Sequence, residues 1–183
     1  MSDVADATSQ REPRLGDYAA VTAVLTAFCV ALIVAVRAGA AQPALPQALI
    51  PPMLGLFALT ALVWLLMVVV RNVSIMLGRV SVRYYVAYAS HTPSEKIERP
   101  ARVFNNLMQV PTLFYVVCLL CLVTGDVDAA QVTLACIYVA ARCLHAVVYM
   151  GWNRVQWRFA CWVASCIALG VIWTRFALLN AGH

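Results

Sequence analysis

The sequence predicts an all-α fold, a membrane-spanning helical bundle, because of its composition and its charge-free stretches. Of 183 residues, 63% are hydrophobic and 11% are charged, whereas charged residues make up about a quarter of an ordinary soluble domain. Five stretches are long and apolar enough to cross a bilayer, which needs about 20 such residues per helix. The chain has no Gly/Ser linker and no internal repeat, so we expect one membrane-embedded unit.

The first two spans are predicted from uncharged stretches on either side of Arg37. Residues 18–36 lie between Asp17 and Arg37, and this gives an N-terminal transmembrane helix at 18–38. Residues 38–70 are also uncharged, but prolines interrupt their first part. Because proline starts helices more readily than it continues them, we expect the second helix to begin near Pro51.

Three further spans follow in the second half of the chain. The third is expected at residues 103–125 and the fourth from about 129 to 150, where Arg142 interrupts an otherwise apolar sequence. The fifth is expected at 159–174 and can begin one turn earlier. Five helices place the two termini on opposite sides of the membrane.

The distribution of cations predicts the orientation, since Lys and Arg accumulate on the cytoplasmic side. Ten cations fall on one side of the five predicted helices: Arg11, Arg14, Arg71, Arg79, Arg83, Lys96, Arg99, Arg102, Arg154 and Arg158. Arg37 and Arg175 fall on the other side. We therefore expect the N-terminus inside and the C-terminus outside, with a cytoplasmic tail at 1–17 and a cytoplasmic loop at about 78–101.

The first helix has an alternative interpretation as a cleaved signal peptide. Ala38-Gly39-Ala40 resembles a small-residue cleavage site. Against this, the segment before the helix carries four acidic residues and two arginines, and the apolar run exceeds the usual ~7–15 residues. We therefore expect an uncleaved anchor, and the orientation of the other four helices is the same in either case.

The cysteines and the cations do not point to metal or nucleic acid. All seven cysteines lie in predicted membrane helices, where thiols pack as small apolar groups. Cys118-x-x-Cys121 has the spacing of half a zinc site, but no second pair or polar ligand accompanies it. We expect no metal site, and no nucleic-acid partner because no basic stripe is interleaved with aromatic residues.

Polar side chains recur at helical spacing on three of the predicted spans, each time near the cytoplasmic end. The three sets are Arg102, Asn106 and Gln109; Arg142, His145 and Tyr149; and Arg154, Arg158 and Trp162. Spacings of three, four, seven and eight residues place each set on one helix face. Taken singly, these residues have a structural alternative as interhelical hydrogen-bonding groups or as arginines that snorkel to the interface.

Arg142 is the residue that the structural alternative explains least well. A charge in the middle of a bilayer costs at least about 2.5–3.5 kcal/mol, and Arg142 lies more than two turns inside its helix. We therefore expect a buried anionic partner. Because the sequence offers few carboxylates nearby, the clustered arginines predict an anionic ligand, whose carboxylates would match guanidinium groups in a bidentate way.

Two motifs resemble the MAPEG family, the membrane-associated proteins of eicosanoid and glutathione metabolism. The first is Glu98-Arg99-x-x-Arg102-x-x-x-Asn106-x-x-Gln109. The second is Arg142-x-x-His145-x-x-x-Tyr149-x-Gly151 followed by Arg154-x-x-x-Arg158, similar to microsomal glutathione transferases and prostaglandin E synthases. Residues 106–115 resemble a bacterial branch, for which we expect a location in the bacterial inner membrane.

The resemblance implies a four-helix domain, here at 45–180, that forms a homotrimer and binds glutathione between protomers. Arg102, Asn106, His145, Tyr149 and Arg158 match positions that contact glutathione, and Arg158 matches the arginine that stabilises its thiolate. We add Gln109, Arg142 and Arg154 to the expected glutathione-binding set. Three features depart from the family: Gln109 replaces a usual Glu, Phe159 stands where the prostaglandin synthases have Ser, and the N-terminal helix is additional.

The expected function is a glutathione-dependent transferase or peroxidase that acts on hydrophobic electrophiles from the bilayer. The alternative is a non-catalytic lipid-binding or scaffold protein of the same fold, in which the arginine cluster serves trimer packing or contacts lipid headgroups. An ion transporter is disfavoured because no acidic residue falls inside the last three predicted spans. Membrane lipid is an expected partner in every case.

Overall fold

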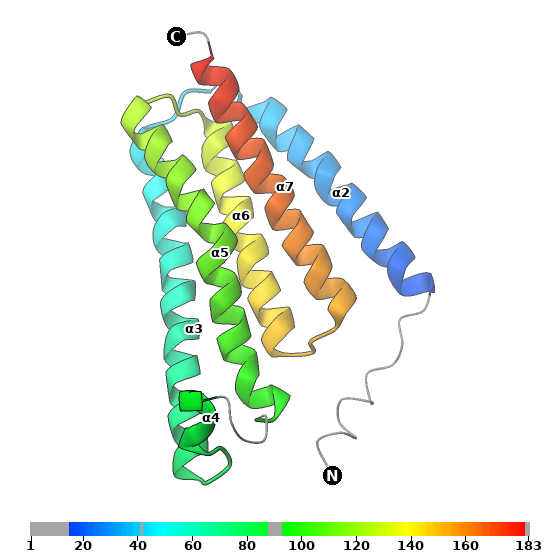
Figure 1. Ribbon diagram of the computed structural model, residues 1–183. Helices are drawn as coiled ribbons and strands as arrows, with labels where there is room; N and C mark the ends of the chain where they lie inside the picture. Colours follow the sequence, from blue (N-terminus) through cyan, green and yellow to red (C-terminus); the bar gives the residue numbers. More distant parts are fainter. Residues whose placement is uncertain (1–14, 41, 88–92, 182–183) are drawn as a thin grey trace.

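Five long helices lie side by side in the structure, a computed structural model that describes residues 15–40, 42–87 and 93–181 (Figure 1). In chain order the elements are α2 (Leu15–Gly39), the 3₁₀ helix η1 (Pro46–Leu49), α3 (Ile50–Met76), α4 (Val82–Ala87), α5 (Glu95–Thr124), α6 (Ala129–Met150) and α7 (Val155–Asn180). The long helices α2, α3, α5, α6 and α7 are each long and apolar enough to cross a membrane. The predicted all-α bundle with five spans is therefore confirmed.

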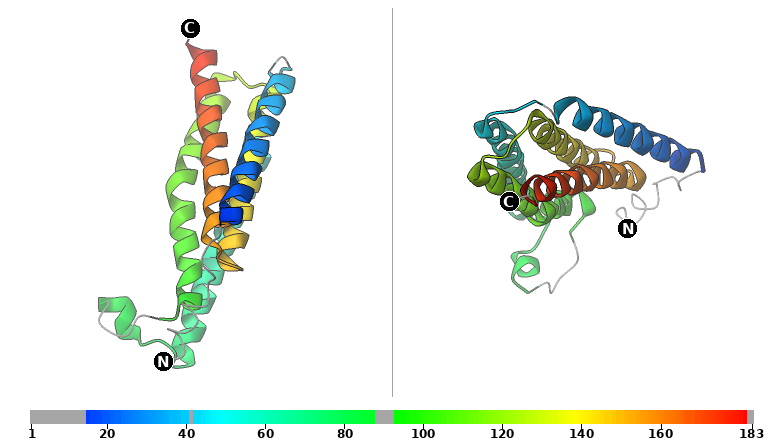
Figure 2. Two further views of the ribbon diagram at one scale, coloured as in Figure 1. Left: turned by 90° about the vertical axis from the view of Figure 1, so that its right-hand side faces the viewer. Right: turned by 90° about the horizontal axis from the view of Figure 1, so that it is seen from above.

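The connections between helices divide the bundle into two ends. The α6–α7 connection and α4 lie at one end, which we call the α4 end, together with the start of α2 (Figure 1). The C-terminus of α7 and the connections that follow α2 and α5 lie at the opposite end, the far end (Figures 1 and 2). Arg11 and Arg14, which contribute to the predicted orientation, and most of the expected tail at 1–17 lie outside the described residues.

The helix boundaries follow from proline and acidic residues. Proline occupies the first turn of α3, where its missing N–H costs no hydrogen bond. The helix α5 begins at Glu95, several residues before the predicted start of the third span, so the end of the loop expected at about 78–101 is helical. Glu95 and Glu98 in its first turn favour this start, because acidic groups stabilise the positive end of a helix dipole. Residues 88–92 of that loop are not among the described residues.

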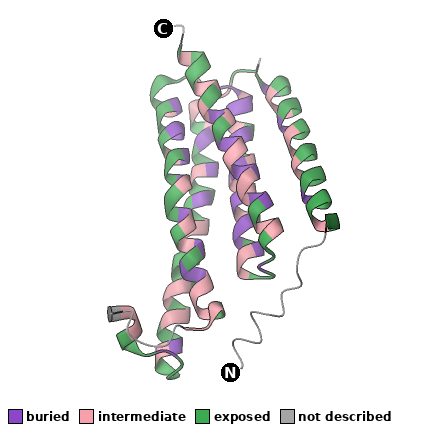
Figure 3. Cartoon of the chain, turned by 45° about the vertical axis from the view of Figure 1, so that its right-hand side comes forward, coloured by how far each residue is buried: buried purple, intermediate pink, exposed green. Residues whose placement is uncertain are grey.

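Apolar side chains from all the long helices form the core. Burial is concentrated on α5, α6 and α7, while much of α2 and α3 faces outward (Figure 3). Phe114 of α5 stacks on Tyr138 of α6 with ring centroids 4.6 Å apart and an interplanar angle of 16°. Such aromatic pairs add about 0.5–1.5 kcal/mol beyond their buried area.

The helix α2 is attached to the rest of the bundle at the far end. The connection after α2 pairs with the α5–α6 turn, since Ala44 N donates to Val127 O at 3.2 Å and Ala129 N donates to Gln42 O at 2.9 Å. Asp128 caps α6 by accepting from Gln131 N at 2.8 Å and also forms an ion pair with Arg175 of α7. This turn therefore joins α2, α6 and α7.

Gly39, the last residue of α2, allows the close approach of α2 to α6. A Cβ atom at Gly39 would lie 2.5 Å from the backbone N of Ala130. We expect Gly39→Ala to lower the stability of the protein by about 1–3 kcal/mol, because backbone atoms must move to admit the methyl group. Thermal unfolding in detergent measures this loss.

Gly16→Ala is the matched control, because Gly16 lies in the same helix and a Cβ there has nothing within 4 Å. The control is expected to leave stability unchanged or slightly increased, since Ala favours helix more than Gly does. Equal behaviour of the two variants would contradict a tight α2–α6 contact at Gly39.

Candidate functional site

A hollow of about 250 Å³ lies among α5, α6 and α7 toward the α4 end. We call it the Arg158 hollow. Its lining residues are Asn106, His145, Tyr149, Val155, Arg158, Phe159 and Trp162. The last turns of α6 carry His145 and Tyr149 at a spacing of four, and the first turns of α7 carry Arg158 and Trp162 at the same spacing. Residues four apart lie above one another on a helix face. His145 and Tyr149 therefore share one face of α6, and Arg158 and Trp162 share one face of α7.

The Arg158 side chain is held in this hollow by two contacts. Its guanidinium carbon lies 4.3 Å from the centroid of the Tyr149 ring, which is cation–π distance. Its Nη1 donates to Oδ1 of Asn153 at 3.0 Å. The arginine therefore has a fixed position in the first turn of α7, where the positive end of the helix dipole adds to its charge.

The orientation of His145 follows from a contact with the backbone of α7. His145 Nδ1 lies 3.0 Å from the carbonyl oxygen of Arg158. A carbonyl oxygen can only accept, so Nδ1 carries the hydrogen, and Nε2 of the neutral ring is then an acceptor. His145 is 3% exposed and its Nε2 has no hydrogen-bond partner among the described residues. A buried polar atom without a partner is uncommon and marks a place for a ligand group.

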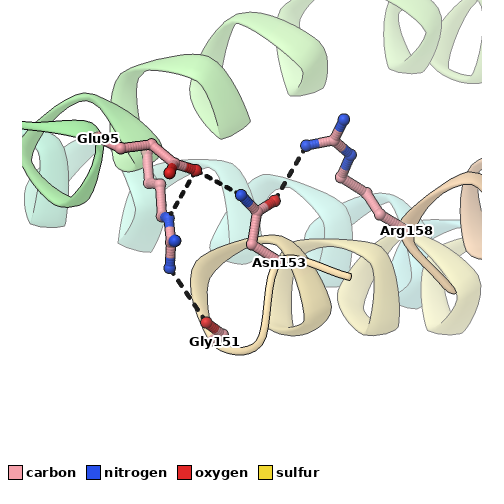
Figure 4. Close-up of polar contacts among 5 residues, drawn as sticks. Glu95, Gly151, Asn153 and Arg158 are labelled. Carbon is pink, nitrogen blue, oxygen red and sulfur yellow. Dashed lines mark hydrogen bonds and ion pairs between the residues drawn. The ribbon is translucent and has the colours of Figure 1, made fainter. Parts of the chain in front are cut away.

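Asn153 links the hollow to the first turn of α5, a contact that the sequence did not predict. Its side-chain N–H donates to Oε1 of Glu95, while its Oδ1 accepts from Arg158 (Figure 4). Glu95 also accepts from Nε of Arg99 at 3.3 Å, and Arg99 Nη1 donates to the carbonyl oxygen of Gly151 at 3.1 Å (Figure 4). The chain of contacts fixes the α6–α7 connection against α5 and positions Arg158.

The backbone conformation explains why asparagine occupies position 153. Asn153 has φ 47°, and it is the one non-glycine residue with positive φ among the described residues. Asparagine tolerates this left-handed region better than most residues. An asparagine between a glycine-containing turn and a helix start was the available signal in the sequence, but no helical spacing connects it to Glu95.

Arg142 is completely buried, and its described hydrogen-bond partner is Asn106. Its Nη2 donates to Asn106 at two oxygens, the carbonyl at 2.9 Å and Oδ1 at 2.8 Å. Within the chain, a carbonyl oxygen and a side-chain amide oxygen accept from this guanidinium, and the expected anionic ligand stays a prediction. Nε and Nη1 of Arg142 are buried without a described hydrogen-bond partner, so this guanidinium retains donors for a further group.

The hollow and its surroundings carry an excess of positive charge. Arg158 lines it, and Arg142 contacts Asn106, which also lines it. Among the described carboxylates, that of Glu95 is connected to Arg158 through Asn153. Its Oε1 already accepts from Arg99 and Asn153. The arrangement can hold an anion, with the apolar side chains of Phe159, Trp162 and Val155 on the remaining walls.

Four of the expected ligand-binding residues do not line the Arg158 hollow: Arg102, Gln109, Arg142 and Arg154. Arg102 and Gln109 are exposed on α5. Arg154 lines a separate hollow with Trp152 and Trp157. Asn106, His145, Tyr149 and Arg158, from three helices, line the same hollow, and Arg142 contacts Asn106.

Comparison with known proteins identifies the fold family. The model of the MAPEG family matches residues 52–178, which is more than half of the chain and includes α5, α6 and nearly all of α3 and α7. No curated protein and no solved structure gives a match. The match begins after α2, so α2 lies outside the matched residues. The chain is an integral membrane protein and belongs to the MAPEG family.

Proposed function

We propose that the protein is a glutathione-dependent transferase or peroxidase that acts on hydrophobic electrophiles dissolved in the membrane. The observation that carries this proposal is the Arg158 hollow, in which a positioned arginine lies beside buried polar atoms that lack partners. Membership of the MAPEG family supports glutathione as the anionic ligand. Glutathione has two carboxylates, which suit guanidinium donors, and a thiol that becomes a nucleophile when it ionises.

The proposed role of Arg158 is to stabilise the thiolate. A free thiol has a pKa of about 8.5 and is mostly protonated at neutral pH. A guanidinium and a helix N-terminus both carry positive charge, and both lower the pKa of a thiol next to them. In the transferase reaction the thiolate sulfur forms a bond to an electrophilic carbon, and the leaving group departs with the bonding electrons. In the peroxidase reaction the thiolate sulfur attacks the terminal oxygen of the hydroperoxide, the O–O bond breaks, and the alcohol is released with one proton. A second glutathione thiol then attacks the sulfur of the resulting sulfenic acid, which forms the disulfide and releases water.

The other residues have proposed roles in binding. Arg142 and Asn106 would hold a carboxylate or a peptide group of glutathione, since two buried nitrogen atoms of Arg142, Nε and Nη1, have no described hydrogen-bond partner. His145 Nε2 would accept a hydrogen bond from a glutathione N–H. Tyr149 holds the Arg158 guanidinium through its ring face.

We further propose that the protein is a homotrimer and that a neighbouring copy covers the exposed polar face of α5. Arg102, Asn105 and Gln109 are all exposed on α5, within a span that is long and apolar enough to cross a membrane. Polar groups at this depth are unfavourable against lipid and are found facing other helices. With a second copy packed on this face, Arg102 and Gln109 would complete the glutathione site between protomers.

The orientation proposed for the trimer places the α4 end, and with it the Arg158 hollow, at the cytoplasmic side of a bacterial inner membrane. Arg79, Arg83, Lys96 and Arg99 belong to this end, and the described cations of the far end are Arg37 and Arg175. Cytoplasmic loops carry an excess of Lys and Arg.

Turnover by the purified trimer tests the proposed activity. Glutathione is supplied with a lipophilic aryl halide or with a lipid hydroperoxide, and product is measured for wild type, Arg158→Ala and Arg154→Gln. We expect Arg158→Ala to lose at least tenfold in kcat/KM and Arg154→Gln to retain activity, because Arg154 lies outside the Arg158 hollow. An intact trimer that turns over neither substrate would instead favour the non-catalytic lipid-binding alternative.

A second prediction concerns Asn153 as a positioning residue for Arg158. Asn153→Gly keeps the left-handed backbone conformation without strain but removes the amide that joins Glu95 to Arg158. We expect the pH at which bound glutathione ionises to rise, and the thiolate signal at neutral pH to fall several-fold. A pH titration of the ultraviolet thiolate band measures both quantities.

Asn153→Ala provides the control for this variant. It removes the same amide but also strains the backbone at positive φ, so it should show the same ionisation shift with a lower unfolding temperature. An unchanged ionisation profile in Asn153→Gly would contradict the positioning role.

A further inference from the structure

A second hollow lies at the α6–α7 connection and takes no part in the proposed reaction. Its volume is about 410 Å³, and its lining residues are Leu144, Val148, Trp152, Arg154, Trp157 and Cys161. We call it the Arg154 groove. It shares no lining residue with the Arg158 hollow. On α6, Leu144 and Val148 each directly precede His145 and Tyr149 of the other hollow, so the two hollows occupy neighbouring helix faces.

The groove is apolar along its length and polar at one end. Leu144, Val148 and Cys161 form the part that lies within α6 and α7. Trp152 and Arg154 lie in the connection between the two helices, at the α4 end, and Trp152 is 76% exposed. Tryptophan and arginine are the side chains that anchor proteins at the boundary between hydrocarbon and headgroups. From Arg154 to Cys161 the groove extends about 10 Å along α7, at 1.5 Å per residue.

Arg154 has the charge and the position to bind an anion at the mouth of this groove. It is the N-cap residue of α7 and its side chain is exposed, with no ion pair to any of the described residues. No side chain caps the N-terminus of α7 among the described residues, so backbone N–H groups of the turn that begins at Arg154 have no side-chain acceptor. An anion with three or four oxygens can use both kinds of donor.

We propose that the Arg154 groove binds an anionic phospholipid, with an acyl chain along Leu144, Val148 and Cys161 and the phosphate on Arg154. The occupant follows from the combination of an apolar groove with a cationic end at interface depth. The α4 end also carries most of the described cations of the chain, which favours anionic over zwitterionic lipid. This lipid site is separate from the glutathione site and is expected whether or not the protein is an enzyme.

Native mass spectrometry of the delipidated trimer in detergent tests the proposal. Phosphatidylglycerol and phosphatidylcholine with identical acyl chains are titrated against wild type, Arg154→Gln and Arg79→Gln. We expect wild type to bind phosphatidylglycerol at least fivefold more tightly than phosphatidylcholine, and Arg154→Gln to lose this preference. Arg79→Gln is the matched control, because Arg79 is an exposed cation of the same end that lines neither hollow, and it should keep the preference.

A second variant tests the acyl-chain part of the groove. Leu144 is 56% exposed, so Leu144→Trp can fill the groove without entering the core. This variant should lower the affinity for both lipids by a similar factor and leave the glutathione thiolate band unchanged. Equal affinity of wild type for the two lipids, or equal losses in Arg154→Gln and Arg79→Gln, would overturn the proposal. Loss of turnover with unchanged lipid binding in Leu144→Trp would also overturn it and would assign the groove to the hydrophobic electrophile.

Discussion

Asn106→Ala is expected to destabilise the bundle by about 3–5 kcal/mol, because it leaves the buried Arg142 guanidinium without its side-chain partner. Arg142 is 0% exposed and lies eight residues, about 12 Å, before the end of α6. Arg142 has two described hydrogen bonds. The one to Asn106 Oδ1 at 2.8 Å would be lost, and the one to the Asn106 carbonyl oxygen at 2.9 Å would remain. Unfolding of the purified protein by SDS titration measures the change.

Arg142→Met is expected to behave in the opposite way. Methionine fills a similar length with an apolar chain, and the substitution removes the cost of a buried charge together with its hydrogen bonds. Stability should be unchanged or increased, whereas glutathione affinity should fall at least tenfold. The double variant Asn106→Ala/Arg142→Met should recover most of the stability lost in Asn106→Ala, since the two residues interact directly.

These variants separate a structural role for Arg142 from a ligand-binding role. A strongly destabilised Arg142→Met would indicate that the guanidinium holds α5 and α6 together and would remove it from the proposed site. Stable protein with undiminished glutathione affinity would likewise contradict the binding role.

Arg158→Ala is expected to return the pKa of bound glutathione to about the value of a free thiol, near 8.5. If Arg158 lowers that pKa by about 2 units, corresponding to about 2.7 kcal/mol, most of the bound glutathione is ionised at neutral pH. In the variant the thiolate would amount to a few per cent. Arg158→Lys keeps the charge but loses the planar group over Tyr149, so an intermediate value is expected.

The sign of the pH dependence follows from the charge of the group that is stabilised. Positive charge favours the deprotonated thiol, so its pKa falls, and the wild-type thiolate signal persists as pH is lowered from 8.5 toward about 6.5. In Arg158→Ala the signal should disappear as pH falls below about 8.5. Coincident titration curves for the two proteins would contradict the role of Arg158.

The spans were predictable because each is a long stretch with few charges, and the polar residues of the Arg158 hollow were predictable where they lie inside helices. His145 and Tyr149 of α6 line the hollow at helical spacing, and so do Arg158 and Trp162 of α7. Arg154 lies four residues before Arg158 but does not line this hollow. It precedes α7 with an extended backbone, φ −69° and ψ 115°, so helical spacing does not apply to it.

Contacts between distant segments could not be predicted from the sequence. The link from Glu95 through Asn153 to Arg158 depends on how the α6–α7 connection docks on α5. The oxygen partner of Arg142 is Asn106, a neutral residue 36 positions away, and no charge pattern in the sequence indicated this pair. Helical periodicity describes each helix by itself, whereas these contacts arise from packing of one helix on another.

The thiolate difference spectrum on adding glutathione to the detergent-purified trimer at neutral pH is the most direct test of the proposed site. Wild type should give a saturable ultraviolet thiolate band, and Arg158→Ala should give none while remaining a folded trimer. Arg154→Gln should give the wild-type band, because Arg154 lines the other groove. Absence of any band in the intact wild-type trimer would contradict binding and activation of glutathione in the Arg158 hollow.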